Sequence, residues 1–356
     1  MKSRVTMKDI AQKLHVSINA VSIALNDKVG VSTETRNCIL NEAEALGYFR
    51  IKNKYKKALM KKNICLIIQE RYFLKSDFYS KIVLGIENEA KKYGYELLIN
   101  FPNEQKHIPD CLNERRACGV ISVGRISDKC LYELKQYKVP IVIVDHTSLS
   151  VPTDCIISNN KQGTYEITRL MIKNGYKKIG FFGDLDYSMS IKDRFAGYKE
   201  AIHTLPFIQD YVDTARYALN FSAFKDIEEN IIHHDVDKII MIVKKIHEIP
   251  EAFVCSNDNA AVILIRALQK IGYRVPNDIG VVGFDNTTLS TASFPHLTTV
   301  NVYKEAMGKT AVDRLIWRLD HLNEPIKSTV LNVKIVIRDS INGCVKRSSQ
   351  FQGSGI

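Results

Sequence analysis

The chain has 356 residues, a formal net charge of +11 and an ordinary globular composition, with 45% hydrophobic and 25% charged residues. No apolar run is long enough to span a bilayer, and the N-terminal "MKSRVTMKDIAQKL" lacks the apolar segment of a secretory signal peptide. We therefore expect a cytoplasmic protein of two or three domains that has no membrane partner.

Positive charge is concentrated at the N-terminus. Residues 1–62 carry 13 Lys or Arg against five Asp or Glu, so eight of the eleven net positive charges lie in the first sixth of the chain. A basic head on a nearly neutral body indicates that the head binds a polyanion. A solvated basic tail is the alternative, but helical periodicity and capping residues predict that this head folds.

The eight cysteines give no sign of a metal or redox site. None forms a C-x-x-C pair, and no cluster of Cys and His has the spacing of a zinc site. Several lie in apolar, strand-like runs such as "NICLII" and "AFVCSN". We expect reduced, mostly buried thiols and no cofactor.

Three short helices are predicted in the head. Thr6, with Asp9 three residues on, begins a helix over "MKDIAQKL". Ser17 begins a second helix over "INAVSIALN", and Ser32 begins a third over "TETRNCILNEAEALG", which Gly47 ends. Two short helices joined by a tight turn, with a third behind them, form a helix-turn-helix unit.

The second of these helices has two distinct faces. Its inward positions carry small or apolar residues: Ala20, Val21, Ala24 and Leu25. Its outward positions are Ile18, Asn19, Ser22 and Ile23. In a DNA-binding protein these outward residues would face the major groove, and the alternative for Asn19 and Ser22 is an ordinary solvated helix face.

The segments "VTMKDIAQKLHVSINAVSIALND" and "VSTETRNCILNEAEALGY" closely resemble the LacI/GalR family of bacterial transcription regulators, without gaps over about forty residues. The resemblance implies that base edges are contacted by Ile18, Asn19, Ala20 and Ile23. It implies that phosphates are contacted by Thr6, Ser17, Ser22, Asn26 and Tyr48.

Two features of this implied interface concern sequence preference. Asn19 can pair with adenine, and an isoleucine can pack on a thymine methyl group. Ile23 departs from the family, in which Arg or His is usual at this position and would bond guanine. We therefore expect an operator that lacks this guanine contact.

The stretch from Arg50 to Lys62 holds seven basic residues and no acidic one. The family usually has here a Pro-Asn start and a short hinge helix, whose Leu enters the minor groove and kinks the DNA. In this chain the Pro is missing and the Leu position falls on Lys57, with Leu59 two residues on. We predict a hinge in which Lys56 and Lys57 bind phosphates by charge; a plain solvated linker is the alternative.

From Asn63 the pattern changes to alternating strands and helices. Runs such as "NICLIIQ", "CGVISVG" and "VPIVIVD" read as buried strands, and amphipathic helices separate them. This alternation predicts parallel sheets with helices on both faces. There is no G-x-G-x-x-G after the first strand and no Walker motif, so nucleotide binding of that type has no support.

The family resemblance continues through this part, more loosely, in segments such as "DRFAGYKEAI", "CSNDNAAVILIRALQKIGYRVPNDIGVVGFDN" and "PHLTTVNVYKEAMGKTAVDRL". It covers roughly residues 5–340. It implies an N-terminal all-α helix-turn-helix domain and an α/β periplasmic-binding-protein-like core of two doubly wound parallel-sheet lobes, with three crossings between the lobes.

The domain boundaries follow from the same resemblance. The expected divisions are a helix-turn-helix domain at 1–49, a hinge at 50–63, a core at 64–341 and a disordered tail at 342–356. Within the core we expect an N-lobe of 64–160 plus 300–322 and a C-lobe of 161–299 plus 323–341.

Polar residues stand at the ends of several predicted strands: Asp145, Asp184, Asn257 with Asp258, and Asp285. In open α/β sheets such ends line the ligand crevice. The resemblance implies effector contacts at Phe78, Asp145, Ser190, Arg194, Asn257 and Asp285. We expect Asp258 to be only the N-cap of the following helix.

The nature of the effector is suggested by the residue types. An arginine fork, a carboxylate that accepts from vicinal hydroxyls and aromatic walls suit a sugar or another ring-bearing molecule. Tyr72, Phe73 and Tyr79 would add aromatic surface near the first strand. A nucleobase is not excluded, because a purine-responsive member of the family uses the same cleft.

The resulting hypothesis is a homodimeric, ligand-responsive transcription regulator, most often a repressor, here of a carbohydrate-utilisation operon. Two heads would bind a near-palindromic operator with half-sites about one helical turn apart. A regulator that takes its signal from a partner protein docked on the N-lobe remains open. A sugar-binding transport receptor is disfavoured by the basic head and the missing signal peptide, and an enzyme by the lack of a nucleophile–base pair, metal cluster or phosphate loop.

Overall fold

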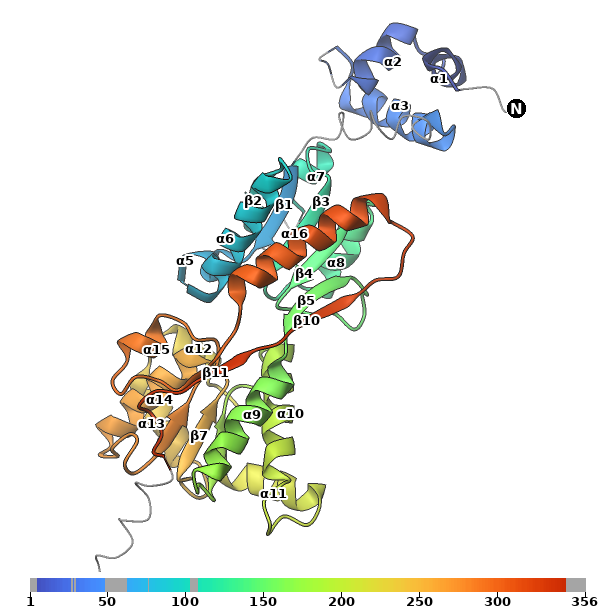
Figure 1. Ribbon diagram of the computed structural model, residues 1–356. Coiled ribbons are helices and arrows are strands. Elements are labelled where there is room, and N and C mark those ends of the chain that lie inside the picture. Colours follow the sequence, from blue (N-terminus) through green and yellow to red (C-terminus); the bar gives the residue numbers. More distant parts are fainter. Residues whose placement is uncertain are drawn as a thin grey trace, which may run out of the picture.

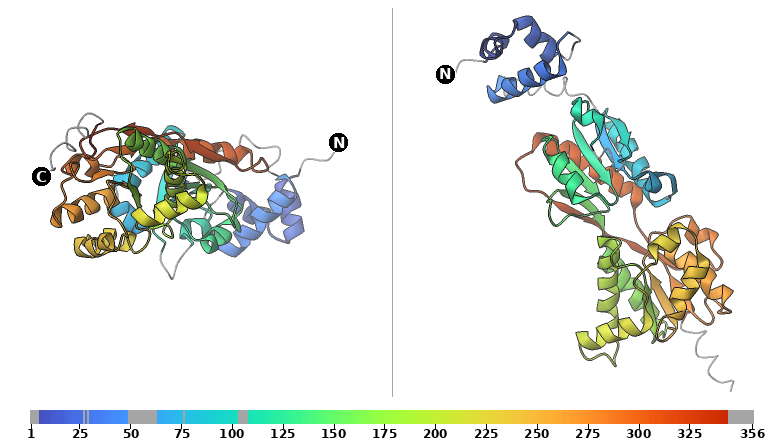
Figure 2. Two further views of the ribbon diagram at one scale, coloured as in Figure 1. Left: turned by 90° about the horizontal axis from the view of Figure 1, so that it is seen from below. Right: turned by 180° about the vertical axis from the view of Figure 1, so that it is seen from behind.

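The computed structural model describes residues 5–26, 28, 30–48, 63–75, 77–102 and 108–343 (Figure 1). The head holds three helices, α1 (Met7–Leu14), α2 (Ile18–Leu25) and α3 (Thr33–Ala45). Two α/β lobes follow, and Figure 2 shows them from behind with the C-terminal segment passing from one to the other. Among the described residues, no helix combines the length and apolar character needed to cross a membrane.

Each helix of the head begins after the N-cap residue that the sequence predicts. Thr6 and Asp9 form a reciprocal capping box, and the hydroxyls of Ser17 and Ser32 accept the N–H groups of Ala20 and Thr35. Each side chain satisfies an amide that the helix itself leaves unbonded. The head has its own apolar core: Ile10, Ala11, Val21, Ala24, Leu25, Ile39 and Ala43.

The N-lobe contains a six-stranded parallel sheet in the order β10-β5-β4-β3-β1-β2. Its strands are β1 (Asn63–Ile68), β2 (Glu96–Asn100), β3 (Gly119–Val123), β4 (Ile141–Val144), β5 (Asp154–Ser158) and β10 (Ser328–Leu331). Its helices are α5 (Glu70–Lys75), α6 (Asp77–Lys92), α7 (Asp110–Asn113), α8 (Asp128–Lys135) and α16 (Lys304–Asp320). The central strands are buried on both faces, as expected for a parallel sheet.

The C-lobe contains a parallel sheet in the order β6-β7-β8, which single bridges extend at Ala223 and Thr298. Its strands are β6 (Ile179–Phe182), β7 (Ala252–Cys255) and β8 (Gly280–Val282). Its helices are α9 (Asn160–Lys173), α10 (Met189–Ile202), α11 (Tyr211–Phe221), α12 (Glu228–Ile232), α13 (Val236–Lys244), α14 (Asp258–Lys270) and α15 (Leu289–Ala292). The fold class predicted from the sequence is confirmed.

Three segments connect the lobes: β5 into α9, β9 (Thr299–Asn301) into α16, and β10 into β11 (Lys334–Val336). Strands β9 and β11 pair antiparallel with each other, so two of the crossings run side by side. One predicted boundary is wrong. Residues 323–341 were assigned to the C-lobe, whereas β10 pairs with β5 in the N-lobe sheet.

The reason for this return to the N-lobe is a buried ion cluster. Asp154 accepts hydrogen bonds from Arg314 and Arg318 at 2.7–2.9 Å and from the Lys327 amide at 2.8 Å. Burial raises the pKa of Asp154, but the bonds from the two arginines outweigh it and lower that pKa overall. The chain after α16 is thereby held at the N-lobe edge, next to Ser328.

Two smaller expectations are also corrected. Asn301, which was placed in the N-lobe, pairs with Lys334 of β11 at the connection between the lobes. The predicted tail begins too early, because Asn342 is buried and its amide donates to the Tyr176 hydroxyl at 3.0 Å. Residues 344–356 lie outside the described part of the chain.

Helices α6 and α16 approach each other through two glycines. A Cβ added at Gly85 would lie 2.3 Å from the Glu305 carbonyl oxygen, and one at Gly308 would lie 2.2 Å from the Ile82 carbonyl oxygen. Both distances are far below any van der Waals contact. Glycine at these two positions therefore fixes the spacing of the helices that cover this side of the N-lobe sheet.

Gly308→Ala is expected to destabilise the protein by about 1–3 kcal/mol, because the backbones must separate to admit the methyl group. The gain in helix propensity, about 1 kcal/mol, offsets part of this loss. Chemical denaturation should show the effect, with Lys309→Ala on the exposed side of the same helix as control. Equal stability of both variants would contradict the close approach.

Candidate effector cleft and nucleic-acid interface

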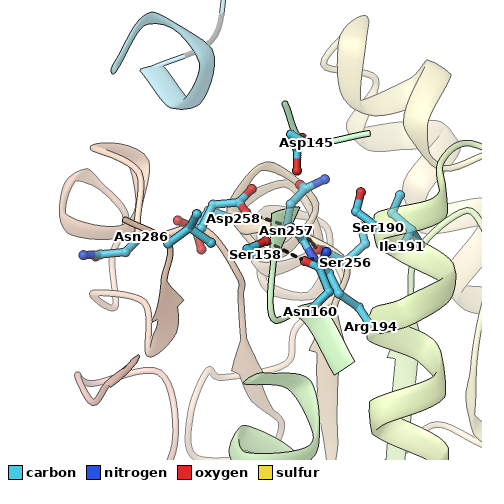
Figure 3. Close-up of polar contacts among 12 residues, drawn as sticks. Asp145, Ser158, Asn160, Ser190, Ile191, Arg194, Ser256, Asn257, Asp258 and Asn286 are labelled. Atoms are coloured by element: carbon cyan, nitrogen blue, oxygen red, sulfur yellow. Dashed lines mark hydrogen bonds and ion pairs between the residues drawn. The ribbon is translucent and has the colours of Figure 1, made fainter. Parts of the chain in front are cut away.

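The polar residues that follow the parallel strands gather where the two lobes face each other (Figure 3). Asp145 follows β4 of the N-lobe, while Asn257 and Asp285 follow β7 and β8 of the C-lobe. Arg194 and Ser190 come from α10. The ends of strands from both sheets, together with the first turns of α10, thus position five of the six predicted effector residues, and Phe78 comes from α6.

Arg194 is the central donor of this region. It is 4% exposed, and its Nε, Nη1 and Nη2 donate to Asn160 Oδ1 at 2.9 Å, the Ser256 carbonyl at 2.5 Å and Asp285 Oδ1 at 3.1 Å. The guanidinium lies 3.9 Å from the centre of the Phe284 ring. A guanidinium bonded in three directions has little freedom, so Arg194 fixes the ends of β7 and β8 relative to α10.

Asp285 sits on a backbone with φ of 108°, a conformation that non-glycine residues rarely adopt. Burial raises the pKa of its carboxyl, and the charges of Arg194 and Lys304 oppose that shift. The Lys304 ammonium also donates to the carbonyl oxygens of Asp285, Asn286 and Val302. Lys304, at the start of α16, thereby ties the N-lobe to the end of β8.

The N-lobe side of the cleft is aromatic. The Tyr79 hydroxyl donates to Asp145 Oδ2 at 3.0 Å, and burial raises the pKa of Asp145 to about 7. The Tyr79 ring stacks on Tyr72 with 4.6 Å between centroids and meets the buried Phe78 edge-on at 5.0 Å. The tyrosines expected near this wall are present, although Phe73 instead packs against Phe101.

The roles expected of Asn257 and Asp258 need correction. Asn257, not Asp258, is the N-cap of α14, and its Oδ1 accepts the Ala260 amide at 2.8 Å. Asp258 is fully buried and accepts bonds from Thr287 and Thr299. The Nδ2 group of Asn257 takes no part in the cap and lies 3.5 Å from Glu228 Oε1.

Ser190 lies in the first turn of α10, above Arg194 in Figure 3. Its hydroxyl is 2.9 Å from that of Ser188, which is the N-cap of the helix. Ser190 is half-buried. It is therefore placed beside the cleft but already shares a hydrogen bond with its neighbour.

Glu228 was missed by the sequence analysis. It begins α12, is only 5% exposed and accepts a bond from Ser256 Oγ at 3.3 Å. Burial raises its pKa to about 7, while Ser256 and Arg194 act against the shift. The local sequence "KDIEENII" resembles any acidic first turn, so nothing in it marks Glu228 as a buried residue that bonds Ser256 and Asn257 after β7.

The raised pKa of Glu228 predicts how the stability of the protein depends on pH. A raised folded-state pKa means that the folded form binds the proton more tightly, so stability falls as the pH rises from the ordinary value of 4.5 to about 7. Glu228→Gln should flatten this slope and stabilise the protein by about 1–3 kcal/mol at pH 8. Denaturation between pH 5 and pH 8 checks this, with the exposed Glu229→Gln as control; parallel curves for all three proteins would contradict it.

The expected DNA-facing residues of α2 lie on one side of the head. Ile18 is 49% exposed, and Asn19 is exposed beside it. Ala20 is half-buried, and Ile23 contacts the turn at Gly30, 3.3 Å from the position of an added Cβ. Ile23 is therefore less accessible than Ile18.

The residues that are expected to contact DNA phosphates already have structural roles in the head. Thr6 and Ser17 are caps, and Ser22 accepts from the Asn26 side chain through its carbonyl at 2.8 Å. Tyr48 is half-buried against the head core. Lys56, Lys57 and Leu59, the expected hinge contacts, lie outside the described residues.

Metal ligands and thiols were compared within the part of the chain that the structure describes. Within the described ranges, no group of three or more His, Cys, Asp or Glu is arranged to hold a metal ion. Of the seven cysteines in these ranges, all are free, six are buried and Cys38 is exposed.

Two family models match the chain. Residues 6–50 match "Bacterial regulatory proteins, lacI family", and residues 168–341 match "Periplasmic binding protein-like domain". The chain is 29% identical over 347 residues to the HTH-type transcriptional repressor PurR of Aliivibrio salmonicida, covering 95% of this chain and 99% of that protein.

Solved structures have the same fold. The transcriptional regulator CelR in complex with cellobiose has a TM-score of 0.66 at 21% identity, covering 95% of this chain and all of that one. The lac repressor dimer bound to operator and the anti-inducer ONPF has a TM-score of 0.61 at 24% identity, covering 95% and 99%. With its head matched by the lacI family model and its core by the periplasmic binding protein-like model, the chain is similar along its length to the LacI family of ligand-responsive, DNA-binding transcription regulators.

Proposed function

We propose that this protein represses a carbohydrate-utilisation operon in the cytoplasm, as a homodimer that binds a near-palindromic operator and has no enzymatic activity. The observation that carries the proposal is a helix-turn-helix head with an exposed Ile18–Asn19 edge, on a core whose lobes enclose Arg194 and Asp285. PurR is named a repressor, and the lac repressor was solved as an operator-bound dimer. These relatives lend no support to the alternative of a signalling partner protein.

We further propose that the effector is a sugar or sugar derivative bound between the lobes. Asp145, Ser190, Arg194, Asn257 and Asp285 would offer its polar contacts. Phe78 is buried and packs edge-on against Tyr79, so it would support the aromatic wall. The cellobiose complex of CelR supports this class of effector.

Effector control would act on contacts that exist only while the lobes are close. Asp77 of α6 accepts the Thr288 amide of the C-lobe at 2.9 Å, and Arg125 donates to the Tyr187 carbonyl at 3.1 Å. A ligand that binds both lobes stabilises this arrangement over an open one by its difference in affinity. The geometry of the two heads would follow the lobes.

Operator selection tests the DNA-binding part. Full-length protein and a random duplex library should yield a palindromic site at physiological salt. Asn19→Ala should lower affinity for that site by about 1–3 kcal/mol and relax one base position, because a bidentate contact is lost. Glu44→Ala, exposed on α3, is the control. Absence of any selected sequence would overturn the proposal.

The hinge is proposed to bind phosphates by charge. Each lysine–phosphate contact adds about one to the slope of log affinity against log salt. Because a dimer carries both lysines twice, Lys56→Ala/Lys57→Ala should therefore reduce the slope by about four while leaving the selected sequence unchanged. A slope equal to that of the wild type would identify a plain solvated linker.

A further inference from the structure

Four buried cysteines belong to a single apolar cluster in the N-lobe. They come from β1, β5, α7 and α8, as Cys65, Cys155, Cys111 and Cys130. Within the described ranges these thiols are not arranged with other ligands around a metal position, and all four are free. The reaction characteristic of neighbouring free thiols is oxidation to a disulfide, so their mutual placement decides whether the cluster has a chemical role.

Two of these thiols lie against each other. The side chains of Cys65 and Cys111 share a hydrogen bond. Asn100 Nδ2 donates to both sulfurs, at 3.6 Å to Cys65 Sγ and 3.9 Å to Cys111 Sγ. Two sulfurs that share one donor and bond each other meet the first requirement of a disulfide, which is proximity.

Cys111 is the thiol of the pair that reacts first. The hydrogen bond from Cys65 lowers the pKa of Cys111 against the effect of burial, and the charge of Arg116 acts in the same direction. The pKa of Cys65, which donates that bond, is raised. The thiolate is the form that attacks an oxidant. Since Cys111 is 3% exposed and Cys65 not at all, the oxidant must be small, and hydrogen peroxide fits this condition.

The turn that carries Cys111 lies at the end of the N-lobe nearest to the head (Figure 1). The Cys111 carbonyl accepts the Arg116 amide at 2.6 Å, and the Arg116 carbonyl accepts Asn63 Nδ2 at 3.0 Å. Asn63 begins β1 and is the first described residue after position 48. Arg115 of the same turn donates to Asn41 Oδ1 of α3 in the head at 3.1 Å. A movement of Cys111 therefore acts on contacts at the start of the core and at the head.

Closing the disulfide requires such a movement. An S–S bond measures about 2.05 Å, which is much shorter than a contact between two separate sulfurs. Strand β1, which carries Cys65, is paired with β2 on one side and β3 on the other, so Cys65 is held in place. Helix α7 has only four residues. The adjustment falls on Cys111 and on the bonds that follow it in the chain.

We propose that Cys65 and Cys111 form a redox-sensitive pair that hydrogen peroxide oxidises to a disulfide, and that this modification lowers the affinity of the protein for its operator. The Cys111 thiolate attacks one peroxide oxygen, which gives a sulfenic acid and releases hydroxide. The Cys65 sulfur displaces the sulfenic hydroxyl, so that the S–S bond forms and water leaves with the thiol proton. In sum, two thiols lose two electrons and two protons, and one peroxide becomes two waters. The effect on DNA binding rests on the proposed function, whereas the disulfide does not.

The modification is tested in full-length reduced protein that is treated with hydrogen peroxide, alkylated and digested with trypsin without reduction. Trypsin places Cys65 in the peptide 63–71 and Cys111 in the peptide 107–115, each with no other cysteine. Mass spectrometry should find these two peptides joined with the loss of two hydrogens. Unlinked peptides, or either peptide joined to another cysteine, would overturn the pair.

Operator binding tests the consequence. The oxidised protein should bind the selected operator about tenfold more weakly than the reduced protein, the effect of about one hydrogen bond lost in each subunit of a dimer. Dithiothreitol should restore the affinity, since it reduces the disulfide. Cys111→Ser and Cys65→Ser should each keep the affinity of the reduced protein and lose the response to peroxide. Cys118→Ser, at a buried thiol outside this cluster, should keep both.

The outcomes separate the modification from its effect and from the proposed function. Equal operator affinity of the linked and the reduced protein would overturn the regulatory effect. A response to peroxide that survives in both Cys111→Ser and Cys65→Ser would overturn the role of the pair. If the reduced protein selects no operator, the proposed function and the effect on DNA are both overturned, and the peptide analysis alone decides the disulfide.

Discussion

The placement of one guanidinium organises the ligand-facing side of the C-lobe. Arg194 reaches from α10 to the carbonyl that ends β7, to the carboxylate that follows β8 and to Asn160 at the first crossing between the lobes. A planar group with donors in fixed directions can bond all three only if strands, helix and crossing keep one geometry. The positive φ at Asp285 is held by the same bonds, since an isolated aspartate would seldom adopt it.

The two lobes are linked by crossings that pair with each other or are anchored in a sheet. The crossings at β9 and β11 pair with each other, so they act as one short ribbon and not as separate strands. On the N-lobe side, the Asp154 cluster returns the chain to the sheet before the last crossing. The lobes are thus joined by three short segments, as in folds that close about a hinge.

Local signals in the sequence predicted the head well. Thr6, Ser17 and Ser32 act through atoms three residues away, so sequence spacing alone determines their bonds. The strand-end positions of Asp145 and Asp285 were also predictable, because in parallel sheets the carboxyl ends of the strands face the same side.

The errors share a physical cause, which is dependence on distant residues. Strand β10 belongs to the N-lobe because of Asp154, more than 170 residues earlier in the chain. Asp258 is not the expected cap, because its carboxylate bonds Thr287 and Thr299. Glu228 was overlooked because its partners, Ser256 and Asn257, lie 28 and 29 residues later in the chain. None of these pairings leaves a mark in local periodicity.

Asp145 and Glu228 are acidic groups whose burial is energetically unfavourable, and a ligand can act on this penalty. Bringing Asp145 and Glu228 into a low-dielectric space forces each to take up a proton or to remain charged without a strong partner. A ligand that supplies such a carboxyl with a strong donor removes this penalty from the state to which it binds. Such a difference in affinity is the only means by which a ligand shifts a conformational equilibrium.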